Sequence, residues 1–274
     1  MWQSAQRSGR TLNMTASFAE PALELSGGGR LPLLGFGTWQ LSGDSAARAI
    51  GWALDAGYRH IDTATMYRNE TQVGKAVRDS GLPREDVFIT TKLPPGHAGR
   101  ERRTLDESLA ALGTDHVDLW LVHWPPNGRP GVSTWENFVA AREDGLARAI
   151  GVSNYSLEQI DTLITATGAA PEVNQIKWSP LLYDADLLSG HRERGVVVEG
   201  YSPFRSGTLS HPVLIEIAAR HGKAPSQLVV RWHIQHEVVV IPKSARQDRL
   251  VANADVFDFE LSTDEMKAID ALAR

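Results

Sequence analysis

The chain has 274 residues, of which 42% are hydrophobic and 22% charged, with a formal net charge of -5 and no cysteine. This length and composition are typical of a globular protein with a substantial core and exclude a disordered chain. The absence of cysteine excludes disulfides, thiol nucleophiles and Cys-based metal centres, and it favours a reducing cytoplasm. The slightly acidic balance disfavours nucleic acid and anionic membranes as partners.

Residues 1 to 17 carry scattered charge and lack an apolar run of the length that a signal peptide needs. They predict a flexible extension, followed by one folded domain over residues 18 to 274. No later segment reaches the roughly 18 apolar residues of a membrane helix. These features predict a cytoplasmic protein that has no membrane partner.

Eight short runs rich in apolar and β-branched residues predict β-strands. In chain order they are 33–38, 60–64, 87–93, 117–124, 147–154, 172–178, 196–203 and 238–244. Segments of helical period lie between them, for example at 44–57, 69–81, 100–113 and 156–168, and most begin at a capping-type residue and end at glycine. Strand and helix therefore alternate along the chain.

This alternation predicts an α/β protein in which eight parallel strands close into a (β/α)8 TIM barrel. The glycine run SGGGR at 26–30 predicts the turn of an N-terminal β-hairpin that closes the bottom of the barrel. The alternative fold is an open, doubly wound sheet. It is disfavoured because no G-x-G-x-x-G sequence follows the first predicted strand.

Catalytic groups in a TIM barrel lie at the C-terminal ends of the strands and in the loops that follow them. The polar residues at those positions are Asp62, Tyr67, Lys92, His123, Ser153, Asn154, Gln175, Tyr201, Ser202, Lys243 and Ser244. Taken singly, each has an ordinary explanation, since a lone lysine there is usually a solvated boundary residue and a lone aspartate usually caps the next helix. An Asp, a Tyr, a Lys and a His on three consecutive strand–loop units suit one chemical task together.

That task is the delivery of a proton to a carbonyl oxygen while a hydride reaches its carbon. A free tyrosine hydroxyl has a pKa near about 10, which is too high for efficient proton transfer at neutral pH. We therefore expect Lys92 to lower the pKa of Tyr67, and Asp62 to hold Lys92 in place as a buried partner. His123 follows the next strand and can donate a hydrogen bond to the same carbonyl oxygen.

Three motifs in the same order make the chain similar to the aldo-keto reductase superfamily. GYRHIDTATMYRNE at 57–70 resembles the family's G-[FY]-R-H-[IL]-D-[TS]-A segment with its later Y-x-N-E, VDLWLVHWP at 117–125 resembles its L-x-H-x-P segment, and IPKSARQDRLVAN at 241–253 resembles its I-P-K-S segment. The resemblance extends from about residue 24 to the C-terminus. It implies a barrel that uses NADPH to reduce aldehydes or ketones to alcohols, and it favours a monomer.

By this resemblance the catalytic residues are Asp62, Tyr67, Lys92 and His123, with Tyr67 as the general acid. The residues that it implies for binding NADPH are Thr38, Asp62, Ser153, Asn154, Gln175, Tyr201, Ser202, Phe204, Lys243, Ser244, Arg249 and Asn253. Within this set, Ser153, Asn154 and Gln175 are expected to bind the nicotinamide carboxamide, because an amide needs both donors and acceptors. Tyr201 is expected to stack on the nicotinamide ring.

Lys243, Ser244 and Arg249 place two cations and a hydroxyl after the last predicted strand. Such a set suits the 2′-phosphate of NADPH and favours it over NADH, with a solvated helix start as the alternative. Many relatives have Glu before the final Asn of this segment, where this chain has Ala252. The preference for NADPH is therefore expected to be less strict.

Trp39 and Trp124 follow strands of the catalytic rim and are expected to line an apolar substrate pocket with Tyr67 and His123, ordinary barrel packing being the alternative. The pocket would take a small-molecule carbonyl substrate. His233 and His236 have an i, i+3 spacing without an H-E-x-x-H motif, so we expect surface residues there and no metal.

A second function stays open at this point. The chain can also be interpreted as a nucleotide-binding regulatory or redox-sensing barrel with little turnover. The presence of all four expected catalytic residues favours the enzyme without excluding this alternative.

Overall fold

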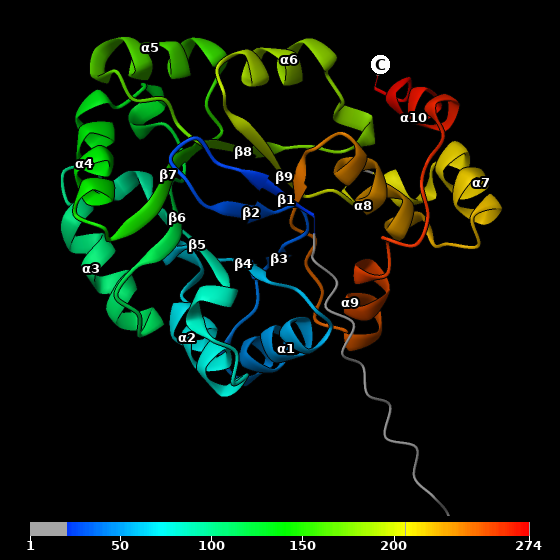
Figure 1. The fold of residues 1–274 in the computed structure, drawn as a ribbon, viewed down its shortest axis with the longest axis horizontal. Helices are drawn as coiled ribbons and strands as arrows, with labels where there is room; N and C mark the ends of the chain where they lie inside the picture. The colour runs from blue at the N-terminus through cyan, green and yellow to red at the C-terminus, as the bar shows by residue number, and fades with distance from the viewer. Residues whose placement is uncertain (1–20, 206, 274) are drawn as a thin grey trace, which may run out of the picture.

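The computed structural model describes residues 21–205 and 207–273 (Figure 1). The extension predicted at residues 1 to 17 lies outside the described residues. Eight parallel strands form one sheet in chain order, with helices on its outer side (Figure 1). They are β3 (Phe36–Gly37), β4 (His60–Asp62), β5 (Phe88–Leu93), β6 (Val117–Val122), β7 (Ala147–Ser153), β8 (Val173–Lys177), β9 (Val197–Tyr201) and β10 (Val239–Val240).

The sheet closes on itself between its first and last strands. Leu34 and Val240 form a parallel bridge, and the Gly35 amide donates to the Val240 carbonyl at 2.8 Å. The Val240 amide in turn donates to the Leu33 carbonyl at 2.9 Å. Every predicted strand segment contains one observed barrel strand, so the predicted (β/α)8 barrel is confirmed.

The helices cover the outside of the barrel. They are α1 (Gly43–Asp55), α2 (Glu70–Asp79), α3 (Glu101–Leu112), α4 (Val132–Glu143), α5 (Leu157–Thr167), α6 (Ala185–Glu193), α7 (Pro212–Arg220), α8 (Pro225–Gln235), α9 (Gln247–Ala254) and α10 (Thr263–Asp270). The local signals act as expected in α5, where Ser156 and Gln159 form a capping box and Gly168 ends the helix with φ 72°. The four helices specified from the sequence are all present.

An antiparallel hairpin of β1 (Ala22–Glu24) and β2 (Arg30–Pro32) lies across the end of the barrel at which the parallel strands begin (Figure 1). Its turn contains Gly28 and Gly29 with φ of 93° and 103°, a backbone conformation that favours glycine. The Gly27 amide donates to the Glu172 carboxylate at 2.8 Å, and Glu172 directly precedes β8. The hairpin therefore closes the N-terminal end of the barrel, as predicted.

The strands are buried on both faces, which explains their continuous apolar sequence. On the outer face, the Trp120 ring of β6 stacks on Phe138 of α4 with centroids 3.7 Å apart. The inner face is more polar than this pattern suggests. Contacts across the barrel show that His60 and Asp62 of β4 point inward, toward Glu199 of β9 and Gln175 of β8 respectively.

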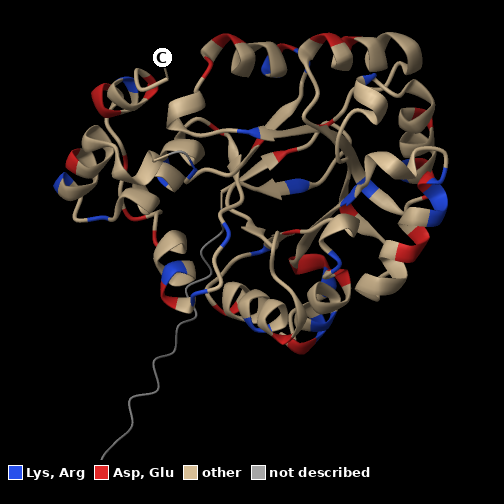
Figure 2. Ribbon diagram, turned by 180° about the vertical axis from the view of Figure 1, so that it is seen from behind, with Lys and Arg blue, Asp and Glu red and all other residues tan. Residues whose placement is uncertain are grey.

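Charged residues of both signs are spread over the outer helices (Figure 2). No helix in the described parts of the chain is long and apolar enough to cross a membrane.

The prediction that His233 and His236 are surface residues was wrong for His233. Its ring is fully buried where α8 packs on the barrel, with Nδ1 2.7 Å from the Val229 carbonyl oxygen. Burial lowers the pKa of His233 to about 4 and keeps the ring neutral. His236 is partly buried, and its Nε2 lies 2.8 Å from the Asp270 carboxylate.

Candidate active site

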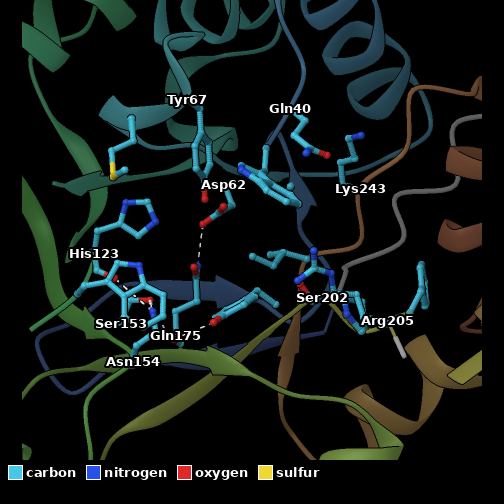
Figure 3. A pocket seen from close by; sticks show the side chains of 18 residues that line it. Gln40, Asp62, Tyr67, His123, Ser153, Asn154, Gln175, Ser202, Arg205 and Lys243 are labelled. Carbon is cyan, nitrogen blue, oxygen red and sulfur yellow. Dashed lines mark hydrogen bonds between the residues drawn. The ribbon is translucent and has the colours of Figure 1, made fainter. Parts of the chain in front are cut away.

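A pocket of about 680 Å³ opens at the C-terminal ends of the barrel strands (Figure 3). It gathers most of the residues that the sequence singled out: Trp39, Asp62, Tyr67, His123, Trp124, Ser153, Asn154, Gln175, Tyr201, Ser202, Phe204 and Lys243. Side chains from opposite sides of the barrel therefore face one cavity.

The base of the pocket is a buried ion pair. The Lys92 ammonium on β5 lies 2.6 Å from the Asp62 carboxylate at the end of β4, and it also donates to the Thr63 carbonyl at 2.7 Å. The Gln175 amide nitrogen donates to the same Asp62 oxygen at 2.8 Å. Burial is the largest single influence and disfavours the ammonium, but the charge and hydrogen bond of Asp62, together with Tyr67 and Glu199, outweigh it, so the pKa of Lys92 is raised. Lys92 is therefore a fixed positive charge.

Tyr67 ends a short 3₁₀ turn, η1 (Thr65–Tyr67), that follows β4 and points the side chain into the pocket (Figure 3). The Lys92 ammonium lies 5.2 Å from the centroid of the Tyr67 ring. Burial raises the pKa of Tyr67, and the charge of Lys92 opposes this rise only in part. Lys92 therefore lowers the pKa of Tyr67 as expected, but burial outweighs this effect, so the pKa lies above that of a free tyrosine and Tyr67 carries its proton at neutral pH.

His123 directly follows β6, and its ring meets the Tyr67 ring edge to face with centroids 5.7 Å apart. Burial, assisted by the charge of Lys92, lowers the pKa of His123 to about 3. The imidazole is thus neutral at physiological pH. It retains one N–H, which is a hydrogen-bond donor for an oxygen placed beside Tyr67.

Hydroxyl and amide groups form a connected network on the opposite wall. Asn154 donates to the Ser153 hydroxyl at 2.9 Å and accepts from the Tyr201 hydroxyl at 2.8 Å. Asn154 and Ser202 both adopt left-handed backbone conformations, with φ of 63° and 59°. Such conformations are uncommon outside glycine and occur often at functional sites. The two residues directly follow β7 and β9, so the backbone has a defined conformation where these strands end beside the pocket.

Four expected cofactor residues lie outside the pocket lining. The Thr38 hydroxyl donates to the Asp62 carbonyl at 3.0 Å, and Ser244 accepts from the Arg246 amide at 3.0 Å. Arg249 and Asn253 lie on α9, beyond the edge of the pocket. Arg249 is exposed and, like Lys243 at the pocket edge, forms no ion pair with another described residue, whereas Arg246 pairs with Asp248. Two cations are thus available for an anionic group.

The apolar side of the pocket is made by large side chains at its mouth. Trp39, Met66 and Trp124 are 46%, 55% and 47% exposed, so they face the opening rather than the packed core. Met66 was not predicted, although its place between Asp62 and Tyr67 was a usable signal. The sequence also missed Arg205, whose guanidinium lies 5.6 Å from the Trp39 ring across the pocket.

Asn69 supports the site from outside the pocket and was also missed. Its amide nitrogen donates to the carbonyls of Thr38 and Leu41 at 2.9 and 3.0 Å, and its oxygen accepts from Thr63 at 2.7 Å. One side chain therefore ties the loop after β3 to the loop that contains Tyr67.

A protonated phenol, a neutral imidazole and a buried ammonium around one cavity form a site for giving a proton to a carbonyl oxygen. With the barrel, they define a carbonyl-reducing oxidoreductase. The model of the Aldo/keto reductase family matches residues 33–274. The chain therefore belongs to the aldo/keto reductase family, whose enzymes use NADP(H), and the predicted family and class of enzyme are confirmed.

Relatives of known name agree with this assignment. The chain is 45% identical to an aldo-keto reductase of Mycolicibacterium smegmatis. The 256 matched residues cover 92% of this chain and 93% of that protein. It is 42% identical to morphine 6-dehydrogenase of Pseudomonas putida, over 92% of this chain and 91% of the relative. Identity to glycerol 2-dehydrogenase (NADP(+)) of Saccharomyces cerevisiae is 38%, over 92% and 90%.

Solved structures share the fold over most of the chain. The crystal structure of an aldo/keto reductase from Brucella melitensis has a TM-score of 0.88 and 41% identity, and covers 92% of this chain and 99% of its own. That of a Bombyx mori aldo-keto reductase in complex with NADP has a TM-score of 0.86 and 33% identity, with 92% of each chain covered.

Proposed function

We propose that the chain reduces aldehydes or ketones to alcohols with Tyr67 as the general acid and NADPH as the hydride donor. The observation that supports this most directly is the position of the Tyr67 side chain, which lines the pocket beside the buried Asp62–Lys92 pair. When bound, NADPH supplies the hydride that reduces the carbonyl carbon. Tyr67 then gives its proton to the oxygen on which negative charge develops, and Lys92 stabilises the phenolate that remains.

His123 orients the carbonyl in this proposal. Because the pKa of His123 is about 3, its ring is neutral at physiological pH. The ring donates an N–H hydrogen bond to the oxygen but has no imidazolium proton to give, so Tyr67 is the acid. Trp39, Met66 and Trp124 exclude water from the reacting carbon and favour an apolar substituent on the carbonyl. The named relatives act on compounds as different as morphine and glycerol, so family membership leaves the substrate to be determined.

The chemistry of the donor set fits NADPH. Ser153, Asn154 and Gln175 offer the donors and acceptors that a carboxamide needs, beside the aromatic face of Tyr201. Lys243 and Arg249, which lack ion-pair partners among the described residues, suit the 2′-phosphate. A Bombyx mori relative with the same fold is known in complex with NADP, which supports this assignment.

The remaining expectations concern the setting of the enzyme. We propose that residues 18–274 act as one domain and as a monomer. The absence of cysteine supports a reducing cytoplasm as its location.

The deciding experiment follows NADPH oxidation with a panel of aromatic and aliphatic aldehydes and ketones. We expect steady turnover by the wild type and a loss of roughly 10²- to 10⁴-fold in Tyr67→Phe, the usual contribution of a general acid. NADPH binding, measured by fluorescence, should be retained. Binding without turnover on any carbonyl would reject the reductase and support the regulatory alternative.

Tyr155→Phe is the matched control for Tyr67→Phe. It also removes a largely buried hydroxyl, which donates to the Pro130 carbonyl at 3.0 Å outside the pocket. Full turnover is expected, so an equal loss in both variants would point to a general structural effect.

A further inference from the structure

Glu199 is a buried carboxyl group to which the proposed chemistry gives no role. It lies in the middle of β9 with no exposed surface, and its side chain points into the barrel toward His60, whose Nε2 is 3.9 Å away. Neither of its carboxyl oxygens accepts a hydrogen bond of good geometry from a described residue; Gln175 of the neighbouring strand is the weakest influence on its pKa and donates instead to Asp62 at 2.8 Å. A buried carboxylate without donors is strongly disfavoured, whereas a neutral carboxylic acid is tolerated.

The groups around Glu199 cannot balance a negative charge. His60 is neutral, because burial and then the charge of Lys92 lower its pKa to about 3. Lys92 is already paired with Asp62, so the two charges cancel. An ionised Glu199 would leave one unpaired negative charge inside the barrel. Burial, and then the charge of Asp62, raise the pKa of Glu199 to about 8.

The titratable and charged groups that act on Glu199 come from three elements packed around it. They are His60 and Asp62 of β4, Lys92 of β5, Tyr67 of η1 and, on β9 itself, no other charged residue. The two neighbouring strands place neutral residues beside it in register, Gln175 of β8 and Val239 of β10. Glu199 therefore interacts electrostatically with both Lys92 and Tyr67 without touching the substrate pocket.

We propose that Glu199 is a positioning residue whose protonated, neutral form keeps the barrel interior uncharged and so keeps Tyr67 an effective acid. This rests on the proposed reductase function. When Glu199 loses its proton, its negative charge raises the pKa of Tyr67. The same charge attracts the Lys92 ammonium, which otherwise stabilises the Asp62 carboxylate and the Tyr67 phenolate. Reduction then becomes slower, although no group that touches the substrate has changed.

The kinetic test compares the pH dependence of kcat in the wild type and in Glu199→Gln, which mimics the neutral acid. In the wild type, kcat for reduction should fall roughly three- to tenfold as the pH rises through the ionisation of Glu199 near 8, as expected for a weaker general acid. Glu199→Gln should retain its low-pH rate across this range. The same fall in both proteins would overturn the proposal.

A second test does not need turnover or a variant. Infrared spectra of the wild type should contain the C=O band of a protonated carboxylic acid at neutral pH, and this band should disappear with a midpoint near 8. Absence of the band at pH 6 would overturn the proposal even if the variant failed to fold. If no carbonyl is turned over, the reductase fails while the charge state of Glu199 is still decided.

Coupling to Tyr67 can also be measured without substrate, from the ultraviolet absorbance of its phenolate, assigned with Tyr67→Phe. Because ionised Glu199 opposes the phenolate, Glu199→Gln should move this ionisation to lower pH by about one pH unit. An unchanged midpoint would overturn the coupling.

Glu70→Gln is the matched control. Glu70 is another buried carboxyl with a raised pKa, caused by its burial, but it accepts a hydrogen bond of 2.6 Å from Thr91. We expect Glu70→Gln to keep both the kinetic transition and the infrared change near pH 8. If that variant alone abolished them, the assignment to Glu199 would be wrong.

Discussion

The buried carboxyl groups at the two ends of the barrel differ in their hydrogen-bond and ion-pair partners. At the N-terminal end, Asp118 accepts from Arg84, Arg148 and the Ile89 amide, and Glu172 accepts from the amides of Gly27 and Ile150. Toward the C-terminal end, the Asp62–Lys92 pair lies beside Tyr67, and Glu199 accepts no hydrogen bond of good geometry in the described parts of the chain. The carboxylates at the N-terminal end contact groups that hold the fold, whereas the carboxyl groups toward the C-terminal end act on Tyr67, where chemistry is expected.

The largest effect should come from removing the ammonium at the C-terminal end. Lys92→Met leaves the Asp62 carboxylate buried without its partner, which should lower the free energy of unfolding by about 3–5 kcal/mol. It should also reduce kcat at least as much as Tyr67→Phe, because the Tyr67 phenolate loses the cation that lies 5.2 Å from its ring centroid. Denaturant unfolding and NADPH oxidation measure the two effects.

The double variant Asp62→Asn/Lys92→Met separates the two roles of this pair. It removes both charges, so most of the lost stability should return while activity stays absent. Recovery of activity would contradict the role given to Lys92.

A change at the opposite end should alter stability alone. Asp118→Asn removes the charge that pairs with Arg84 and Arg148, and it should lower the free energy of unfolding by about 1–3 kcal/mol. Because Asp118 lies outside the pocket, kcat and the KM for NADPH should stay at wild-type values. A change in kcat without loss of stability would contradict the assignment of Asp118 to the stability of the fold alone.

A smaller effect is expected at the edge of the pocket. Arg249→Ala should raise the KM for NADPH about tenfold, corresponding to about 1.4 kcal/mol for one charged contact, with little change for NADH. Arg246→Ala is the matched control, since Arg246 is already paired with Asp248 and should have little effect on either cofactor. An equal loss with NADH would show that Arg249 does not recognise the 2′-phosphate.

The smallest expected effect is a flat pH response. A basic group with a lowered pKa stays neutral until the pH falls to that value, so His123 should not titrate between pH 5 and 7 and kcat should be constant there. The unfolded chain protonates this histidine near pH 6.5, so its contribution to stability is lost as the pH falls from 6.5 toward 3. A step in kcat near 6.5 would indicate an imidazolium in the reaction.

Much of this arrangement could be predicted from local patterns. The eight strands are apolar runs bounded by polar residues, and the identity of the residues at the strand ends is sufficient to propose Asp62, Tyr67, Lys92 and His123. The interior of the barrel was harder to foresee. In the sequence, Glu199 is a single charged residue within the apolar run VVVEGY. Only the contact with His60 across the barrel shows that its side chain points inward.

The errors share a physical cause, because they concern burial rather than residue type. The i, i+3 spacing of His233 and His236 does not say which face of α8 packs on the barrel. The direction of the pKa of Tyr67 depends on how much water the finished pocket excludes, which outweighs the charge of Lys92. Arg205 lies in the loop after β9 and Met66 in η1, and the positions of these segments follow from tertiary contacts, such as those of Asn69.

The hairpin places the first described residues of the chain at the end of the barrel away from the pocket. A support or fluorophore joined to the protein beside β1 would therefore leave the pocket mouth facing bulk solution. Substrate would reach an immobilised enzyme of this kind without passing the point of attachment. The same geometry makes the β1–β2 end the natural handle for oriented display of this barrel.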